Sequence, residues 1–287
     1  MFNDKVKSLI IDFANREDFI QSLIETGPRT DPTVEKTDIL DYNFTFGTEN
    51  IARYRSTKFF MDELGDEFLL VQKRKVNLSY IDNTINDVLS YVVITKDIVR
   101  INLTFMQNFN IQEYVNNMSM AKVIIDKNDA IDVSTIPVNK VYIYPKPSKD
   151  DYLTCCNEFF VNVLDIGKGL YQGKTLYAIN KYYEEAKNRL DEMTSYFIGC
   201  TYDFRVDVGS NYENFKLYLD KEHYDRYLMT YPQPDRDKMW ATLFNSCMLF
   251  RKQALVVAEK LGFEYIKFAD RDILSYLRKL WNKYSAD

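Results

Sequence analysis

The chain has 287 residues, a length that supports two domains with separate hydrophobic cores. Apolar residues make up 46% and charged residues 28%, a composition typical of soluble globular proteins that excludes an intrinsically disordered chain. The formal net charge of −5 leaves no basic excess for phosphate backbones or anionic lipid, so we expect neither a nucleic-acid nor a membrane partner.

The N-terminal segment MFNDKVKSLIIDFANRED is charged and amphipathic, whereas a signal peptide carries an uninterrupted apolar core. No apolar run reaches the roughly 20 residues of a membrane span. We therefore predict a cytoplasmic protein. Its four cysteines show no C-x-x-C spacing and are expected to be reduced structural thiols. The single histidine, His223, lies in the polar segment YLDKEHYDRY and is predicted to be an exposed surface residue.

The first half of the chain alternates between helical and strand patterns. Val6, Leu9, Ile10 and Phe13 recur at helical spacing, which predicts an amphipathic helix over 4–15. Further helices are predicted over 56–65 and 111–118, and strands over 19–25, 40–46, 67–75, 89–95, 99–106 and 121–127. Three residues separate the strands at 89–95 and 99–106, so these two should form a hairpin. The pattern predicts one mixed sheet with flanking helices.

The second half has long helical periods. Helices are predicted over 149–171, 175–199, 211–229, 235–261 and 268–284, with breaks at Gly173, Gly209, Pro232, Pro234 and Gly262. The segment YPKPSKDD at 144–151, which contains two prolines, separates the mixed helix and strand patterns from the long helical ones. The sequence therefore predicts an α+β protein with one domain over 1–143 and a helical bundle over 144–287. Trp240 and Trp281 are expected to anchor the core of the bundle.

Polar residues gather at one place in the predicted sheet. Gly27 lies in a turn after the first strand, Asp41 and Asn43 share one face of the next strand, and Asn102 lies on a later strand. Carboxylate and amide oxygens can coordinate Mg²⁺. Taken alone, Asp41 could equally cap a turn, and the two asparagines could be polar residues at a sheet edge.

This layout is similar to the nucleotidyltransferase fold, which has a Gly-Ser after its first strand, an Asp-x-Asp on the next and a third Asp on a neighbouring strand. The chain also resembles the aminoglycoside 6-adenylyltransferases, through DYLTCCNEFF at 151–160, GKGLYQGKTLYAIN at 167–180 and VGSNYENFKLYL at 208–219. The resemblance implies a nucleotidyltransferase domain over 1–143 and a substrate-binding helical domain over 144–287. It also implies that AMP moves from ATP, with Mg²⁺, to a hydroxyl of streptomycin or a similar small molecule in the interdomain cleft.

Several family positions carry a different residue in this chain. Gly27, Pro28 and Arg29 stand where the family has Gly-Ser-Arg, and proline removes a backbone N–H as well as the serine hydroxyl. Asn43 and Asn102 stand where the family has aspartates. The resemblance thus implies that Asp41 is the surviving metal ligand, with Asn43 and Asn102 as weak ones, and that the nucleotide lies against the Gly27 turn.

In the helical domain, Asn180 replaces an aspartate that the resemblance assigns to the substrate, and Ser210 replaces a lysine assigned to the phosphates. Glu158 in CCNEFF either faces the cleft or is a solvated helix residue. Lys168 either reaches phosphate or interacts with the end of its helix.

The amide substitutions leave one carboxylate at the expected metal site where the family has three. The formal charge of the site therefore falls from −3 to −1. We therefore predict that the transfer activity is weak or absent. Among nearby acids, Asp126 is the best candidate to replace a lost carboxylate as general base, whereas Asp38 and Asp97 are expected at strand ends, facing away. The alternative is a noncatalytic protein that binds a nucleotide, an aminoglycoside-like ligand or a protein partner.

Overall fold

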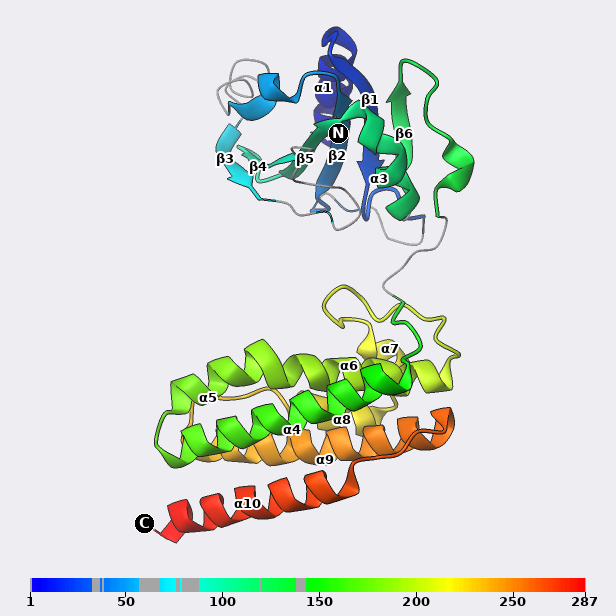
Figure 1. Cartoon of the computed structure of the whole chain (residues 1–287). Coiled ribbons are helices and arrows are strands. Elements are labelled where there is room, and N and C mark those ends of the chain that lie inside the picture. Colours follow the sequence, from blue (N-terminus) through cyan, green and yellow to red (C-terminus); the bar gives the residue numbers. More distant parts are fainter. Residues whose placement is uncertain are drawn as a thin grey trace. The chain divides into compact units, whose positions relative to one another are not determined.

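The computed structural model describes residues 2–32, 37, 39–56, 68–75, 78, 88–118, 120–137 and 143–286. The chain divides into two compact units, Met1–Lys140 and Val141–Asp287 (Figure 1). Asp38 and, apart from Ser56, the helix predicted over 56–65 lie outside the described residues.

The first unit contains a mixed sheet with helices on both faces, as predicted. Its helices and strands are α1 (Phe2–Arg16), β1 (Ile20–Thr26), β2 (Tyr42–Thr48), β3 (Phe68–Arg74), β4 (Leu89–Thr95), β5 (Arg100–Gln107), α3 (Ile111–Asn117) and β6 (Lys122–Asp126). These strands pair in the order β3-β4-β5-β2-β1-β6. The predicted hairpin of β4 and β5 is confirmed, because the two strands are antiparallel neighbours. β2 and β5 run parallel.

Alternation along β2 gives the sheet two different faces. Phe44 and Phe46 point to the face covered by α1, where Phe13 meets Phe46 edge to face with ring centroids 5.7 Å apart. Asn43 and Thr45 point to the opposite face, which α3 covers in part. The apolar side chains of β2 thus anchor the strand and hold its polar ones in place on the α3 side.

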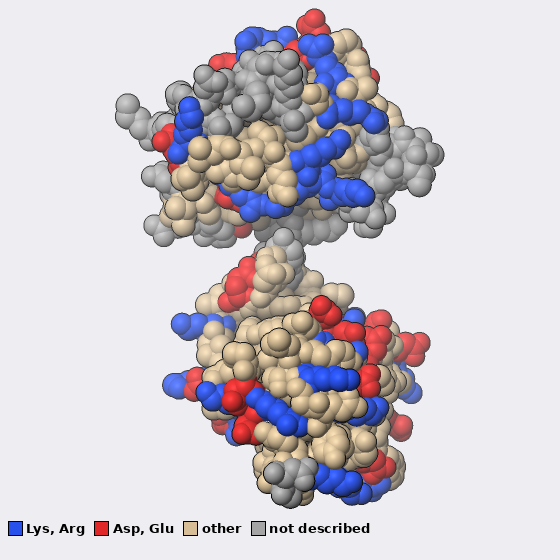
Figure 2. Space-filling view, turned by 90° about the vertical axis from the view of Figure 1, so that its left-hand side faces the viewer, with Lys and Arg blue, Asp and Glu red and all other residues tan. Residues whose placement is uncertain are grey.

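Strand β3 is last in the strand order, and its exposed residues include Lys73 and Arg74. Figure 2 looks at this side of the first unit and shows lysine and arginine side chains spread across it. Charged side chains on an outer strand discourage pairing with another chain. The position of β3 at the end of the strand order therefore accounts for Lys73 and Arg74.

The second unit is helical, as predicted. Its helices are α4 (Lys149–Tyr171), α5 (Thr175–Lys181), α6 (Lys187–Thr201), α7 (Phe215–Tyr218), α8 (Lys221–Leu228), α9 (Arg236–Leu261) and α10 (Lys267–Ala286). A π-helical turn, Tyr182–Ala186, joins α5 to α6. The helix predicted over 211–229 is instead two short ones, because Leu219 is extended and Asp220 caps a new helix by accepting from the N–H of His223. No helix in the described part of the chain combines the length and apolarity needed to cross a bilayer.

The core of the second unit lies between α4, α6 and α9. Phe159 and Phe250 stack with ring centroids 3.9 Å apart, and Trp240 is buried as predicted. Trp281 is 41% exposed, so its assignment to the core was wrong; it lies on α10 and meets Phe244 in an edge-to-face contact, with ring centroids 6.1 Å apart. His223 was also misplaced, because its ring stacks on Phe197 and only 14% of the side chain is exposed.

Candidate functional site

Four side chains lie together at the start of the parallel strand pair β2 and β5. Asn43 lies opposite Asn102 in the register. Asp41, which was predicted on the strand, immediately precedes β2 and meets Arg100, the first residue of β5. Side chains two residues apart on a strand share a face. We call Asp41, Asn43, Arg100 and Asn102 the strand-pair array.

The two amides of the array are bound to each other. Asn102 Nδ2 donates to Asn43 Oδ1 over 2.9 Å. The other end of the Asn43 amide faces the turn after β1, where a Cβ added to Gly27 would lie 2.6 Å from Asn43 Nδ2. Gly27 also has φ +83°, a conformation that favours glycine. The Asn43 amide is therefore enclosed by Asn102 at its oxygen and by the Gly27 turn at its nitrogen.

The single carboxylate of the array faces a cation. Arg100 Nε lies 3.5 Å from Asp41 Oδ2, and both side chains are more than a third exposed. An ion pair that water reaches contributes little stability, typically 0 to about 1 kcal/mol. It does cancel the local charge, so the carboxylate of Asp41 is already offset by a neighbouring guanidinium.

Arg29 anchors the Gly27 turn to the start of β2. Its Nε and Nη2 donate to the Leu40 carbonyl over 3.0 and 2.6 Å. Its guanidinium carbon lies 3.8 Å from the centre of the Tyr42 ring, a cation–π contact. Pro28 is exposed and contributes no N–H to the turn. These contacts make Arg29 a structural clamp on the two segments that carry Gly27 and Asp41.

Helix α3 closes the other end of the polar face. Thr45 Oγ1 donates to the phenol oxygen of Tyr114 over 2.9 Å. Burial raises the pKa of Tyr114 above its ordinary value, although hydrogen bonds with Thr45 and Thr26 partly oppose this rise. The phenol therefore stays neutral, and the polar face beyond the array continues as hydroxyl groups without charge.

The donors of this face do not fit Mg²⁺. The ion needs near-octahedral oxygen ligands and usually takes one or two carboxylates. Here one amide oxygen already accepts a hydrogen bond from Asn102, and the only carboxylate of the array faces Arg100. Within the described residues, no cluster of three or more His, Cys, Asp or Glu side chains could hold a metal ion.

The structure does not bring Asp126 to the array. Asp126 lies opposite Ser22 on β1, whereas Asn43 lies opposite Thr26, four residues further along the same strand. Four residues of strand correspond to roughly 13 Å. Asp126 Oδ2 instead accepts from the N–H of Ile131 over 2.8 Å and so closes a turn. Asp97 lies in the exposed turn between β4 and β5, as predicted.

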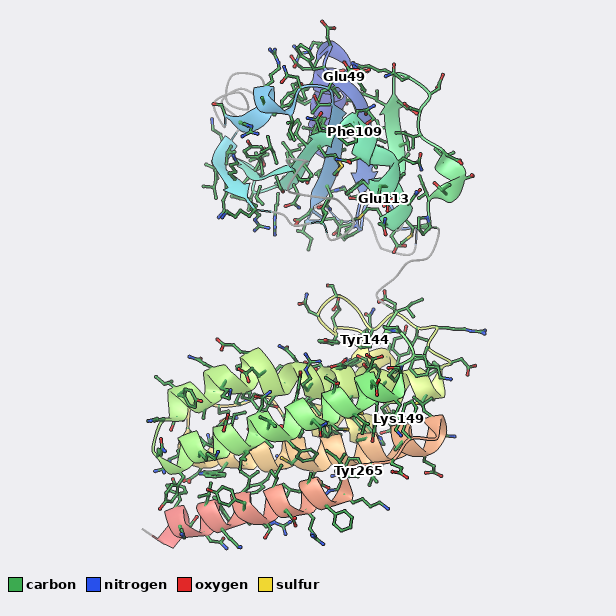
Figure 3. All side chains as sticks on the ribbon, in the orientation of Figure 1. Glu49, Phe109, Glu113, Tyr144, Lys149 and Tyr265 are labelled. Atoms are coloured by element: carbon green, nitrogen blue, oxygen red, sulfur yellow. The ribbon has the colours of Figure 1, made fainter. Side chains whose placement is uncertain are left out.

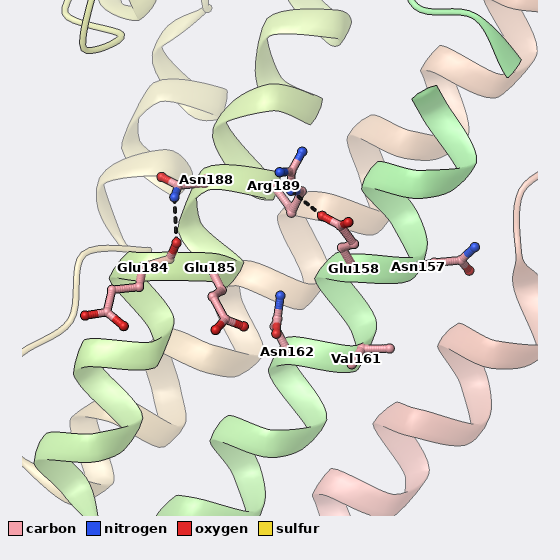
Figure 4. A pocket seen from close by; sticks show the side chains of 8 residues that line it. All are labelled: Asn157, Glu158, Val161, Asn162, Glu184, Glu185, Asn188 and Arg189. Atoms are coloured by element: carbon pink, nitrogen blue, oxygen red, sulfur yellow. Dashed lines mark hydrogen bonds and ion pairs between the residues drawn. The ribbon is translucent and has the colours of Figure 1, made fainter. Parts of the chain in front are cut away.

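In the second unit, Glu158 lines a pocket of about 440 Å³ beside the π-helical turn (Figure 4). It pairs with Arg189, whose Nε lies 2.8 Å from Glu158 Oε2, and Arg189 also binds Glu192. Asn180 is exposed on α5 and is not among the residues that line this pocket. Lys168 pairs with Asp165 one turn earlier on α4, near the end of that helix.

Ser210 lies in a loop whose polar groups surround the carboxylate of Glu213, a residue of the same loop. Glu213 Oε2 accepts from the N–H of Asn211 over 2.8 Å, and Ser210 Oγ lies 3.5 Å from Glu213 Oε1. Burial raises the pKa of Glu213, but donation from the backbone N–H groups of Glu213, Asn211 and Ser210 lowers it by more. This loop therefore already contains an anion, the carboxylate of Glu213.

A polar network in the second unit involves residues that the sequence reading did not single out. The Tyr144 and Tyr196 rings meet edge to face 5.5 Å apart, and Tyr196 donates to Glu192 over 2.7 Å; Figure 3 labels Tyr144 before the start of α4.

In the first unit, Arg100 is the site residue that the sequence pattern had not been used to predict. Its spacing of two from Asn102 places both on one face of a strand, so the strand period could have identified it.

Comparisons with known proteins extend over both units. The family model described as streptomycin adenylyltransferase matches residues 2–280. An aminoglycoside 6-adenylyltransferase of Campylobacter jejuni is 28% identical over 284 residues, with 99% of this chain and 97% of the relative covered. Its counterpart in Bacillus subtilis (strain 168) is 23% identical over 278 residues, covering 96% of this chain and 97% of the relative. The crystal structure of an aminoglycoside 6-adenyltransferase from Bacillus subtilis covers 95% of this chain and 96% of that chain, with 22% identity and a TM-score of 0.47.

Proposed function

Because the chain belongs to the streptomycin adenylyltransferase family, we propose that it is an aminoglycoside 6-adenylyltransferase-like protein whose own AMP transfer is weak or absent. The family reaction would move AMP from ATP, with Mg²⁺, to a hydroxyl of streptomycin or a similar aminoglycoside. The observation that carries the proposal is the hydrogen bond between Asn102 and Asn43, at the two positions where the family pattern has carboxylates.

Electrostatics supports a large loss of rate. A nucleoside triphosphate brings its own negative charge to the site, and metal ions held by carboxylates offset that charge in the transition state. Removing a single preorganised group of this kind commonly costs about 10² to 10³ in rate. Here two carboxylates are replaced by amides, and the third, Asp41, faces Arg100. The combined cost exceeds that of either change alone.

A second candidate function is supported by the same residues. Asn43 and Asn102 are joined by a hydrogen bond, Arg29 holds the Gly27 turn to Leu40, and Asp41 pairs with Arg100, so this surface keeps a defined geometry without its carboxylates. On this reading the protein binds a nucleotide or an aminoglycoside-like small molecule without chemical turnover. In the second unit, Glu158 with the pocket it lines, and the exposed Asn180, are the candidate contacts for an aminoglycoside-like molecule.

The test is mass spectrometry of streptomycin after incubation with the protein, ATP and Mg²⁺. We expect little or no AMP adduct with the natural sequence, at a rate far below that of the variant Asn43→Asp/Asn102→Asp. Adduct formation as fast as that of the variant would overturn the proposal and mean that Asp41 suffices with the amides as they are.

The matched protein is the variant Asn43→Asp/Asn102→Asp, assayed in parallel. An adduct with this variant alone would trace the loss to the two carboxylates. If the variant is also inactive, the changes at Pro28, Asn180 and Ser210 contribute to the loss.

A further inference from the structure

The strand-pair array has no net charge. Asp41 contributes −1, Arg100 contributes +1, and the two amides contribute nothing, so the sum is zero. With aspartates at positions 43 and 102, the same four positions would sum to −2. One Mg²⁺ ion would return that sum to zero. The two amides thus give the unliganded array the charge that a carboxylate-bearing array reaches only after it has bound one divalent cation.

From this balance we infer that the array accepts the polyphosphate chain of a nucleotide without a divalent cation. The inference rests on the proposed function, because it assumes that the chain keeps its family's nucleotide site while losing transfer. A carboxylate-bearing array repels free ATP until a metal ion intervenes, since like charges at close range repel more strongly near a protein surface than in bulk water. The amide-bearing array removes this repulsion.

Arg100 provides the attractive part of the interaction. Its side chain as a whole is 39% exposed, whereas its Nε is buried, lies 3.5 Å from Asp41 Oδ2 in an ion pair and makes no hydrogen bond within the described residues. A ligand can therefore reach only the exposed part of this side chain. A guanidinium offers planar N–H donors that match phosphate oxygens. Arg29 is engaged with Leu40 and Tyr42, so of the two arginines described in the array and the Gly27 turn, Arg100 is the one we assign to the phosphates.

The first experiment titrates ATP into the full-length protein by isothermal calorimetry, once with EDTA and once with excess Mg²⁺. We expect ATP to bind in EDTA, and to bind equally or more weakly in Mg²⁺. The reason is that Mg²⁺ neutralises the negative charge of the ATP phosphates, which Arg100 attracts. Binding that requires Mg²⁺, or no binding in EDTA, overturns the inference.

Two variants test whether the array carries this binding. In EDTA, Asn43→Asp/Asn102→Asp should bind ATP at least about tenfold more weakly than the natural protein, and Mg²⁺ should restore the affinity. Arg100→Gln should also weaken binding in EDTA. Its matched control, Lys96→Gln, removes the same charge from the exposed turn between β4 and β5 and should bind as the natural protein does. Equal binding by all four proteins would place the nucleotide elsewhere and overturn the inference.

The two proposals can fail separately. Formation of an AMP adduct on streptomycin as fast as with Asn43→Asp/Asn102→Asp would overturn the loss of transfer, and it is measured with Mg²⁺ present. Absence of ATP binding in EDTA would overturn metal-independent binding and leave the loss of transfer intact. Circular dichroism of each variant establishes that the sheet is folded before its affinity is compared.

Discussion

At the scale of single residues, Asn43 and Asn102 differ from aspartate by one atom each, yet the exchange alters how the two strands meet. Two carboxylates at these positions would repel each other and require a cation between them. Two amides satisfy each other directly, as the 2.9 Å contact between Asn102 Nδ2 and Asn43 Oδ1 demonstrates. The hydrogen bond therefore removes the need for a cation between these two side chains, which the backbone pairing of β2 and β5 holds side by side.

Restoring the aspartates should create a cation site. We expect Asn43→Asp/Asn102→Asp to bind Mn²⁺, a spectroscopic substitute for Mg²⁺, at least about tenfold more tightly than the natural protein does. Electron paramagnetic resonance of free Mn²⁺ measures the difference. The single variant Asn43→Asp should gain much less, because Asn102 Nδ2 can still donate to the new carboxylate. Equal Mn²⁺ binding by the natural protein and the double variant would contradict this account.

Glu213 offers a test that depends on pH. Burial raises the pKa of its carboxyl, but the backbone N–H groups of its loop lower it by more. A folded-state pKa below the unfolded one stabilises the protein above the unfolded value, about 4.3 for glutamate, and this contribution disappears as the pH falls through the folded value. Glu213→Gln should therefore lower the melting temperature at pH 7 and have less effect below pH 4.

The control for this prediction is Glu259→Gln, which changes an exposed glutamate on α9. It should leave the melting temperature nearly unchanged at both pH values. A loss for Glu213→Gln that is as large at low pH as at pH 7 would mean that the glutamine amide clashes with the loop, and that the carboxylate charge is irrelevant there.

At the scale of elements, the close packing of α4 on α10 depends on one glycine. A Cβ added to Gly167 would lie 2.2 Å from Leu277 Cδ2. Overpacking of this kind costs typically 1–3 kcal/mol, whereas replacing a helix glycine with alanine returns up to about 1 kcal/mol of helix propensity. We expect Gly167→Ala to lower the free energy of unfolding by about 1 kcal/mol, as measured by urea titration with tryptophan fluorescence.

Val161→Ala on the same helix is the matched control, because Val161 is 59% exposed and its loss should cost about 0.5 kcal/mol or less. If Gly167→Ala instead raises the free energy of unfolding, Leu277 can rotate away at little cost and the contact between the helices is looser than it appears.

Some of these elements were predictable from local chemistry and others were not. The bounds of α4 match the prediction because its start is marked by Ser148 and Asp151, which cap each other, and its end by Gly173. The strand period placed Asn43 and Asn102 on candidate faces. Their pairing depends on the register of β2 against β5, which only long-range contacts determine. The π-helical turn at Tyr182–Ala186 has no comparable local pattern.

At the scale of the whole molecule, the two units differ in the residues that report on unfolding, namely cysteine thiols and tryptophans. All four cysteines and both tryptophans belong to the second unit. Cys155, Cys156 and Cys247 are fully buried in its core, and burial raises the pKa of Cys156 to about 12. A thiol reagent needs the thiolate, so these cysteines should react only when the unit unfolds. Thiol and tryptophan signals therefore both report on the helical unit.

This assignment leads to a prediction about Phe250, which stacks on Phe159 between α9 and α4. Truncating a buried phenylalanine to alanine costs about 3–5 kcal/mol. In a Cys200→Ser background, which removes the partly exposed thiol, Phe250→Ala should shift the urea midpoints of thiol reaction and tryptophan fluorescence by the same amount. If the thiols instead react well before the fluorescence changes, α4 separates from α9 while Trp240 is still packed, and the helical unit does not unfold as a single cooperative core.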